Sequence, residues 1–166
     1  MTSEKLQDVP ATYTPAWLDA LVHQSHLPTK EQAIKWVILV DRDLPVGLQV
    51  NAAACLSAAV GKAAPAMVGA GGIDAAGSPH AGLPWTGCTV LAATAPIVKT
   101  VRASALAEPD LLVADMAATA QRVRVYDDYL AELARLEDDD LSYYAVTLAG
   151  PRALVDRLTG RFPLLK

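Results

Sequence analysis

Acidic and amide side chains gather where an apolar run of this chain gives way to a helical segment. Asp41 and Asp43 end the run, and Gly47 and Asn51 lie just beyond it. In α/β proteins ligands bind beyond the carboxyl ends of strands, so this junction is the first candidate site. Two carboxylates at i and i+2 of an extended segment point the same way, and such a pair can bind Mg²⁺ or share a proton. The favoured alternative is that one carboxylate caps the following helix and the other faces solvent, so no metal site is predicted.

Asn51 interrupts an alanine-rich stretch. Because asparagine is a modest helix former, a specific hydrogen bond is expected to offset its cost. That bond would go either to a ligand or to the segment 41–47. Both interpretations stay open.

Asp74, Gly77 and His80 lie in a glycine- and proline-rich segment, 62–87, with little predicted structure of its own. An Asp–His pair can act as a base for hydrolysis, because imidazole titrates near neutral pH and a carboxylate fixes its tautomer. The favoured alternative is an ordinary loop with an Asx-turn at Asp74. Asp74 is therefore retained as a ligand-binding candidate and His80 as a catalytic one.

The remaining reactive side chains indicate structure rather than chemistry. Cys55 and Cys88 form no CxxC motif and are predicted to be buried thiols of the core. His23 and His26 have metal-ligand spacing, but no third ligand accompanies them, so a surface pair is predicted. Neither a GxGxxG nor a GxxxxGK motif occurs, and no cofactor is predicted.

The apolar pattern predicts the elements that would position these residues. Short apolar runs alternate with helical segments, which is typical of a three-layer α/β/α sandwich with a four-stranded mixed sheet. A tail and short helix are expected over residues 1–32, loose over 1–13, and a single domain over 33–166. Helices are expected over residues 15–24, 46–60, 95–107, 126–136 and 151–158. Strands are expected over 35–41, 88–93, 111–115 and 143–148, with a further short one at 66–68.

Composition narrows the class of protein. The 166 residues carry a net charge of −4 without a dense basic run, so nucleic acid is not an expected partner. No apolar stretch approaches the roughly 20 residues of a membrane span, and the first residues do not resemble a signal peptide. These features predict a soluble, cytoplasmic protein without a membrane partner.

Residues 33–166 resemble an uncharacterised bacterial family that has a type II peptidyl-tRNA hydrolase-like fold. The resemblance rests on seven short motifs spread along the domain. These are Lys-Trp-Val at 35–37, Asp-x-Asp-Leu at 41–44, Asn-Ala-Ala-Ala at 51–54, Asp-x-x-Gly-x-x-His at 74–80, Gly-Pro-Arg at 150–152, Leu-Thr-Gly at 158–160 and Pro-Leu-Leu at 163–165.

Three further stretches are similar to the type II peptidyl-tRNA hydrolases themselves. They are residues 43–55, Asp-Met-Ala-Ala-Thr at 115–119, and residues 146–151, which are similar to the final strand and its Gly-Pro turn. The similarity implies that Asp115 and Thr119 occupy site positions. The lysines that these hydrolases carry after the first strand are absent, because residues 48–50 read Leu-Gln-Val. A lysine there would bind phosphate or stabilise an oxyanion.

Three functions are therefore weighed. The first is a module that binds a small molecule or peptide, or a regulator, on a hydrolase fold that has lost its lysine. The second is an ester or amide hydrolase in which Asp115 activates water, Thr119 binds substrate and His80 is the base. The third, compatible with both, is a homodimer subunit whose alanine-rich helices and apolar tail pack across a two-fold axis.

Overall fold

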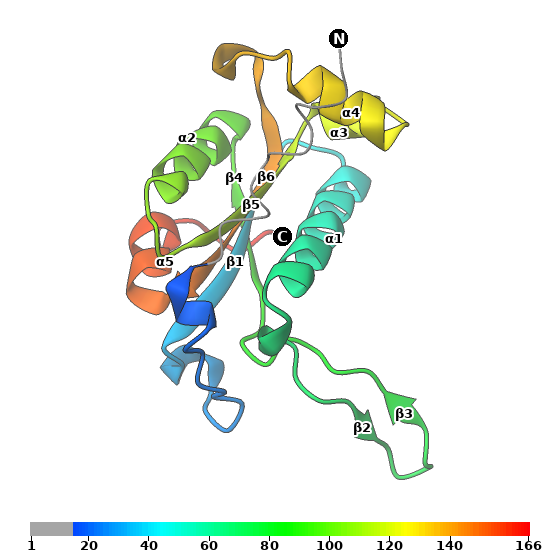
Figure 1. The fold of residues 1–166 in the computed structure, drawn as a ribbon, viewed down its shortest axis with the longest axis vertical. Coiled ribbons are helices and arrows are strands. Elements are labelled where there is room, and N and C mark those ends of the chain that lie inside the picture. The colour runs from blue at the N-terminus through cyan, green and yellow to red at the C-terminus, as the bar shows by residue number, and fades with distance from the viewer. Residues whose placement is uncertain (1–14) are drawn as a thin grey trace.

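The computed structural model describes residues 15–166, so the segment 1–13 lies outside it. The described residues form five α-helices, a four-stranded mixed sheet and a separate two-stranded hairpin (Figure 1). The strands of the sheet are β1 (Ile34–Asp41), β4 (Thr89–Ala93), β5 (Leu112–Ala117) and β6 (Tyr143–Pro151). The helices are α1 (Val46–Ala63), α2 (Ala95–Leu106), α3 (Thr119–Arg122), α4 (Tyr126–Leu133) and α5 (Arg152–Thr159).

The sheet has the strand order β4-β1-β6-β5. β1 pairs with β4 in parallel, and β6 is antiparallel to both of its neighbours, β1 and β5. β1, β4 and β5 therefore point the same way, and their carboxyl ends meet at one end of the sheet. This topology brings the residues after β1 and the residues after β5 to the same end of the molecule.

The central strands are buried on both faces, which explains their nearly continuous apolar sequence. Trp36, Ile38 and Val40 of β1 pack in the core that includes α1 residues, whereas Val37 and Leu39 pack in the core that includes α2 and α5 residues. Figure 1 shows α1 on one side of the sheet and α2 with α5 on the other. The four predicted strands and the four predicted helices after residue 45 are present, with their ends shifted by a few residues.

One buried hydrogen-bond chain ties the two central strands together. The indole Nε1 of Trp36 donates to the hydroxyl of Thr147 at 2.7 Å, and that hydroxyl donates to the carbonyl oxygen of Val37 at 3.0 Å. Thr147 is fully buried. Its hydroxyl thus gives the buried indole N–H an acceptor, which a buried donor needs.

The prediction of a helix over 15–24 is wrong. Only a 3₁₀ turn, η2 (Ala16–Leu18), forms there. Trp17, Leu18 and Leu21 still pack against the α1-side core. Tertiary contacts thus bury these side chains without a helix, and so short a helix has little stability of its own.

The segment 62–87 contains more structure than expected. The predicted short strand at 66–68 is instead a 3₁₀ turn, η4 (Pro65–Met67), followed by an isolated bridge between Val68 and Pro84. Beyond it, β2 (Gly72–Ile73) and β3 (Pro79–His80) form an antiparallel hairpin. Two more 3₁₀ turns occur, η3 (Thr29–Glu31) and η5 (Asp138–Asp140), and η5 is an exposed turn of three aspartates.

The apolar C-terminal tail covers the outer edge of β4. The amide of Ala92 donates to the carbonyl of Pro163, and the amide of Leu165 donates to the carbonyl of Val90. The tail therefore adds to its own sheet, and these edge groups are not free to pair across a two-fold axis. Within residues 15–166, no helix is long and apolar enough to cross a membrane.

Candidate functional site

A cavity of about 470 Å³ opens beside β5, between the middle of α1 and the α3–α4 region. We call it the Asp115 cavity. Its wall combines polar and aromatic side chains from two parts of the chain, residues 51–59 of α1 and residues 115–129. The lining residues are Asn51, Cys55, Leu56, Ala59, Asp115, Met116, Ala120, Val123, Arg124, Tyr126 and Tyr129.

Asp115 is held by an arginine of α2. The Arg102 Nε donates to the Oδ2 of Asp115 at 2.6 Å, and both side chains are only about a quarter exposed, at 24% and 23%. The Arg102 guanidinium also lies over the ring of Tyr143, 4.4 Å from its centroid. The guanidinium is thus fixed between an aromatic face and a carboxylate, and it fixes the carboxylate in turn.

Two tyrosines beside Asp115 remain protonated at neutral pH. Burial raises the pKa of Tyr129, and the negative charge of Asp115 raises it further. Burial also raises the pKa of Tyr143, and Asp115 acts in the same direction while Arg102 opposes it. Both phenols are therefore available as hydrogen-bond donors. The hydroxyl of Tyr143 is buried without a partner among the described residues.

Asn51 and Arg124 add further polar groups to the wall. Asn51 is exposed on α1, and its carboxamide can both donate and accept. Arg124 is exposed in the turn between α3 and α4, and no carboxylate of the described residues lies within 4.0 Å of it. The cavity thus offers amide, carboxylate, phenol and guanidinium groups together, which suits the recognition of a polar ligand.

This arrangement differs from the expectation that no cationic side chain serves the site. The positive charge comes from Arg102 and Arg124 rather than from the turn after β1. The sequence shows no dense basic run, and neither arginine was singled out from it as a site residue. The opposite charges of Arg102 and Asp115 were the available signal, but their spacing does not show that α2 packs beside β5.

Thr119 is not brought into the cavity wall. It begins α3, is 2% exposed, and its hydroxyl has no hydrogen-bond partner within the described residues. The side chain lies in the interior next to the cavity-lining Ala120. A direct contact between its hydroxyl and a substrate is therefore not part of this geometry.

The turn after β1 engages its own polar groups. Asp41 is buried, and its Oδ1 accepts a hydrogen bond from the amide of Asp43 at 3.2 Å, while the side chain of Asp43 is 71% exposed. The buried Gln49, which sequence reasoning did not single out, donates to the carbonyls of Arg42 and Leu44 at 3.1 and 2.8 Å. One carboxylate is thus a turn partner and the other is solvated. Neither caps α1, whose N-cap residue is Pro45 without a side-chain hydrogen bond, so the predicted cap is wrong.

Gly47 lies exposed in the first turn of α1, and a Cβ atom built there would meet nothing within 4 Å. The position therefore does not require glycine for close approach. Of the four candidates between residues 41 and 51, the structure brings only Asn51 to the Asp115 cavity.

Asp74 and His80 lie together, but away from Asp115. The His80 Nε2 is 3.4 Å from the Oδ2 of Asp74, on the exposed β2–β3 hairpin. Asp74 also accepts amide hydrogen bonds from Ser78 and Ala76, and the Ser78 amide, followed by His80, holds the pKa of its carboxyl below the usual value. Figure 1 shows the hairpin projecting beyond the end of α1 that is opposite to α3 and α4.

The three residues of the hydrolase hypothesis are therefore not assembled. His80 is too remote to serve as a base for Asp115, and the pair at Asp74 is the Asx-turn of the alternative interpretation. His80 lies apart from Asp115 because the segment between η4 and β4 forms its own hairpin instead of folding over the end of the sheet.

The two cysteines are exposed, so the prediction of two buried core thiols is wrong. Cys55 lines the Asp115 cavity on the outward side of α1. Protein packed round the sulfur raises the pKa of the Cys88 thiol to about 12, although the residue as a whole is exposed. Cys88 is consequently a poor nucleophile at neutral pH.

The predicted histidine pair contributes an aromatic contact. The ring of His23 lies 4.9 Å from that of Trp85, centroid to centroid. Residues 15–166 contain no group of three or more side chains placed to hold a metal ion.

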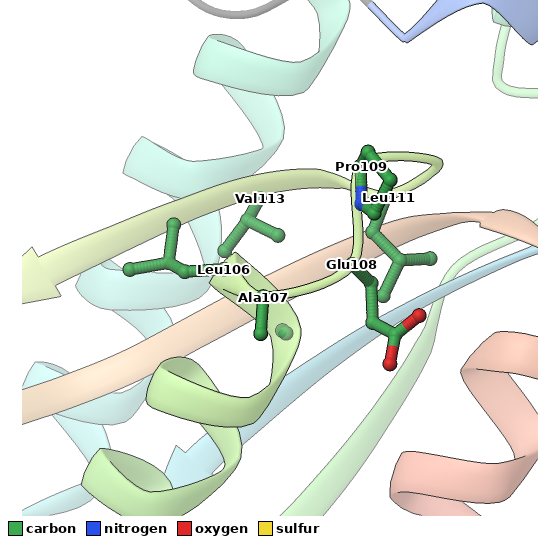
Figure 2. Close-up of a pocket in the computed structure, with 7 residues that line it drawn as sticks. Leu106, Ala107, Glu108, Pro109, Leu111 and Val113 are labelled. Atoms are coloured by element: carbon green, nitrogen blue, oxygen red, sulfur yellow. The ribbon is translucent and has the colours of Figure 1, made fainter.

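A second hollow, of about 380 Å³, lies at the turn from α2 into β5 and is mainly apolar. Figure 2 shows Leu106, Leu111 and Val113 along it, with Glu108 as the charged neighbour. The carboxylate of Glu108 is already paired with Arg157 at 2.8 Å. The hollow therefore offers an apolar surface rather than groups for chemistry.

Comparison with known proteins places the chain in a family. Residues 34–166 match the model of a protein family of unknown function, DUF2000. The chain belongs to that family. No curated protein matches this DUF2000 chain.

The DUF2000 chain shares its fold with a solved protein of unknown function, Atu0240 from Agrobacterium tumefaciens strain C58. The TM-score is 0.71 at 16% sequence identity, over 80% of this chain and 98% of the other. At that identity the match shows the fold alone. The family and the neighbour confirm the expected uncharacterised relatives, and neither adds a ligand or a reaction.

Proposed function

We propose that this chain binds a small polar molecule or a peptide end in the Asp115 cavity, as a binding or regulatory module. The observation that supports it is the convergence of Asn51, Asp115, Arg124 and the two α4 tyrosines on one cavity. These groups come from α1, β5, the α3–α4 turn and α4. A cavity of about 470 Å³ is within the range that encloses small ligands.

The charges of the wall indicate the class of ligand. Arg102 already neutralises much of the charge on Asp115, whereas Arg124 has no carboxylate partner in the described part of the chain. A ligand with one negative group would pair with Arg124, and an amide in it would exchange hydrogen bonds with Asn51. The flat faces of Tyr126 and Tyr129 would cover its apolar part. An acylated amino acid or the carboxyl end of a peptide has this chemistry.

A panel of N-acetyl amino acids and N-acetyl dipeptides tests the proposal by thermal shift, followed by calorimetry. Asn51→Ala and Arg124→Ala are expected to weaken binding about tenfold each, because each removes one recognition group. Asn51 and Arg124 are exposed, so both variants should fold. Gln121→Ala, an exposed change on α3 outside the wall, is the control. No stabilisation of the natural chain by any member of the panel would refute the proposal.

Hydrolysis of an ester or amide bond is the second candidate, and the common cavity of Asp115 and Asn51 favours it. Asp115 would orient or deprotonate water, and the amide of Asn51 would polarise the carbonyl. Turnover of peptidyl-tRNA and aminoacyl esters by the natural chain, compared with Asp115→Asn, tests this mechanism. Equal turnover by the two proteins would eliminate it.

Two broader interpretations remain proposals. The helices on both sides of the sheet support a three-layer α/β/α sandwich related to the type II peptidyl-tRNA hydrolases. A homodimer is supported by the exposed Leu106 beside the apolar hollow at the start of β5, and sedimentation of the natural chain against Leu106→Glu tests it.

A further inference from the structure

A third hollow, of about 400 Å³, lies at the start of β1, at the end of the sheet opposite α3 and α4 (Figure 1). We call it the Arg152 hollow. Three cationic side chains and three hydroxyls contribute to its wall, although the chain as a whole is acidic. The lining residues are Thr29, Lys30, Lys35, Trp36, Thr86, Gly87, Cys88, Thr89 and Arg152.

Arg152 is held rigidly by backbone carbonyls. Its Nε donates to the carbonyl of Gln32 at 2.7 Å, and its Nη2 donates to the carbonyls of Ile34, at 3.3 Å, and of Thr29. The remaining nitrogen, Nη1, donates to no group of the described residues. No carboxylate in this part of the chain lies within 4.0 Å of the guanidinium. Arg152 thus presents a fixed positive charge with two N–H groups to spare.

Two lysines add to this charge, and one carboxylate offsets part of it. Lys35 Nζ lies 2.6 Å from the Oδ1 of Asp156, which leaves the ammonium with two further N–H donors. Lys30 is exposed in η3 and forms no ion pair with the described residues. The wall therefore carries three positive charges, and one of them is paired with Asp156, which does not itself line the hollow.

The rest of the wall supplies neutral donors and a close-fitting backbone. Gly87 has φ +63°, a conformation that side chains rarely adopt, and a Cβ built there would lie 3.6 Å from the Cγ2 of Thr29. Thr86 and Thr89, which flank this turn in the sequence, both line the hollow. With its pKa raised to about 12, the thiol of Cys88 stays neutral and adds no negative charge.

We propose that the Arg152 hollow binds a phosphate group, as part of a small phosphorylated molecule. A fixed guanidinium, two ammonium groups and the hydroxyls of Thr29 and Thr89 are donors that phosphate oxygens accept from. The hydroxyl of Thr86 already donates to the carbonyl of Gly87 at 2.9 Å. The hollow is larger than a phosphate ion, so part of it is left for an attached organic group. This site lies at the other end of β1 from the Asp115 cavity, and it is independent of the function proposed there.

Inorganic phosphate and phenyl phosphate are suitable probes, titrated by calorimetry at constant ionic strength with chloride as the reference anion. Lys30→Glu reverses an exposed charge at the rim and should leave the fold intact, as circular dichroism would verify. It is expected to weaken phosphate binding at least about tenfold. Lys62→Glu, the same change at an exposed lysine outside the hollow, should alter binding less than about twofold.

The opposite results overturn the proposal. Absence of saturable binding by the natural chain would show that the hollow holds no phosphate. Equal weakening by Lys30→Glu and Lys62→Glu would show a response to overall charge only. Phenyl phosphate that binds more weakly than inorganic phosphate would exclude the attached organic group.

Discussion

The ion pair between Arg102 and Asp115 should couple the two residues energetically, and a double-mutant cycle measures that coupling. Arg102→Met keeps the unbranched stem beside Tyr143, and Asp115→Asn keeps the shape of the carboxylate. Exposed ion pairs contribute about 0.2–1 kcal/mol, whereas hydrogen bonds to charged groups contribute about 1.5–3 kcal/mol. At 2.6 Å, with both side chains about a quarter exposed, the pair should lie between these ranges, at about 1–2 kcal/mol.

Urea unfolding at low salt and at high salt is the assay. Thermal unfolding is a second measurement: a change of 1 kcal/mol in the free energy of unfolding should move its midpoint by about 2–4 °C in a chain of this size. The pair Arg157–Glu108 is a matched control, because its separation of 2.8 Å is similar while Arg157 is 57% exposed. Its coupling should be smaller and should fall further in salt, since exposed charges are screened more.

Equal coupling energies in the two pairs would refute this reasoning. Asp115 would then be no better anchored than a surface carboxylate. If the coupling is larger for Arg102–Asp115, Arg102→Met should also weaken ligand binding in the Asp115 cavity. The substitution removes the guanidinium that holds the Asp115 carboxylate in place.

Three further changes test the fold and the hairpin. Thr147→Val should destabilise the chain by about 1–3 kcal/mol, measured by urea unfolding, because the indole N–H of Trp36 loses its buried acceptor. Gly82→Ala should disrupt the neck of the hairpin, since its Cβ would lie 1.8 Å from a backbone oxygen, whereas Gly72→Ala meets nothing within 4 Å and should be tolerated; hydrogen exchange reports the difference. The folded-state pKa of Asp74 lies below 3.8, so its turn should be retained above pH 3.8 and lost as the pH falls through that lower value. Amide chemical shifts across an acid titration would show this, and a carboxyl that titrates at 3.8 or above would contradict it.

Much of the fold follows from local pattern. The apolar run in β1 predicts a strand buried on both faces, because only a strand covered on both sides has no need of alternating polar residues. The apolar tail was assigned to a dimer contact in one hypothesis from its sequence, whereas in the structure it pairs with the edge of β4 in its own chain. The helix predicted at Trp17 failed because its apolar side chains reach the core from an irregular backbone.

Less of the candidate site could be predicted. Asn51 was singled out from the rule that ligands bind near strand ends, and Asp115 from the resemblance to the hydrolases. The structure places both residues in the wall of one cavity, and their role there stays a prediction. His80 was grouped with them on chemical type alone, whereas it lies on the β2–β3 hairpin, remote from Asp115. Cys55 was assigned to the core from the usual burial of thiols, whereas the face of α1 that carries it is turned outward.

Residue order alone was sufficient for the strands, most helices and the Asx-turn at Asp74, since these depend on interactions between near neighbours in the chain. The partner of Asp115 was decided by packing. Arg102 meets it only because α2 lies beside the edge strand β5, and the arginine of the third hollow is fixed by carbonyls more than a hundred residues earlier. Ion pairs and hydrogen bonds depend on distance in space, so the separation of two residues along the chain does not predict which groups they join.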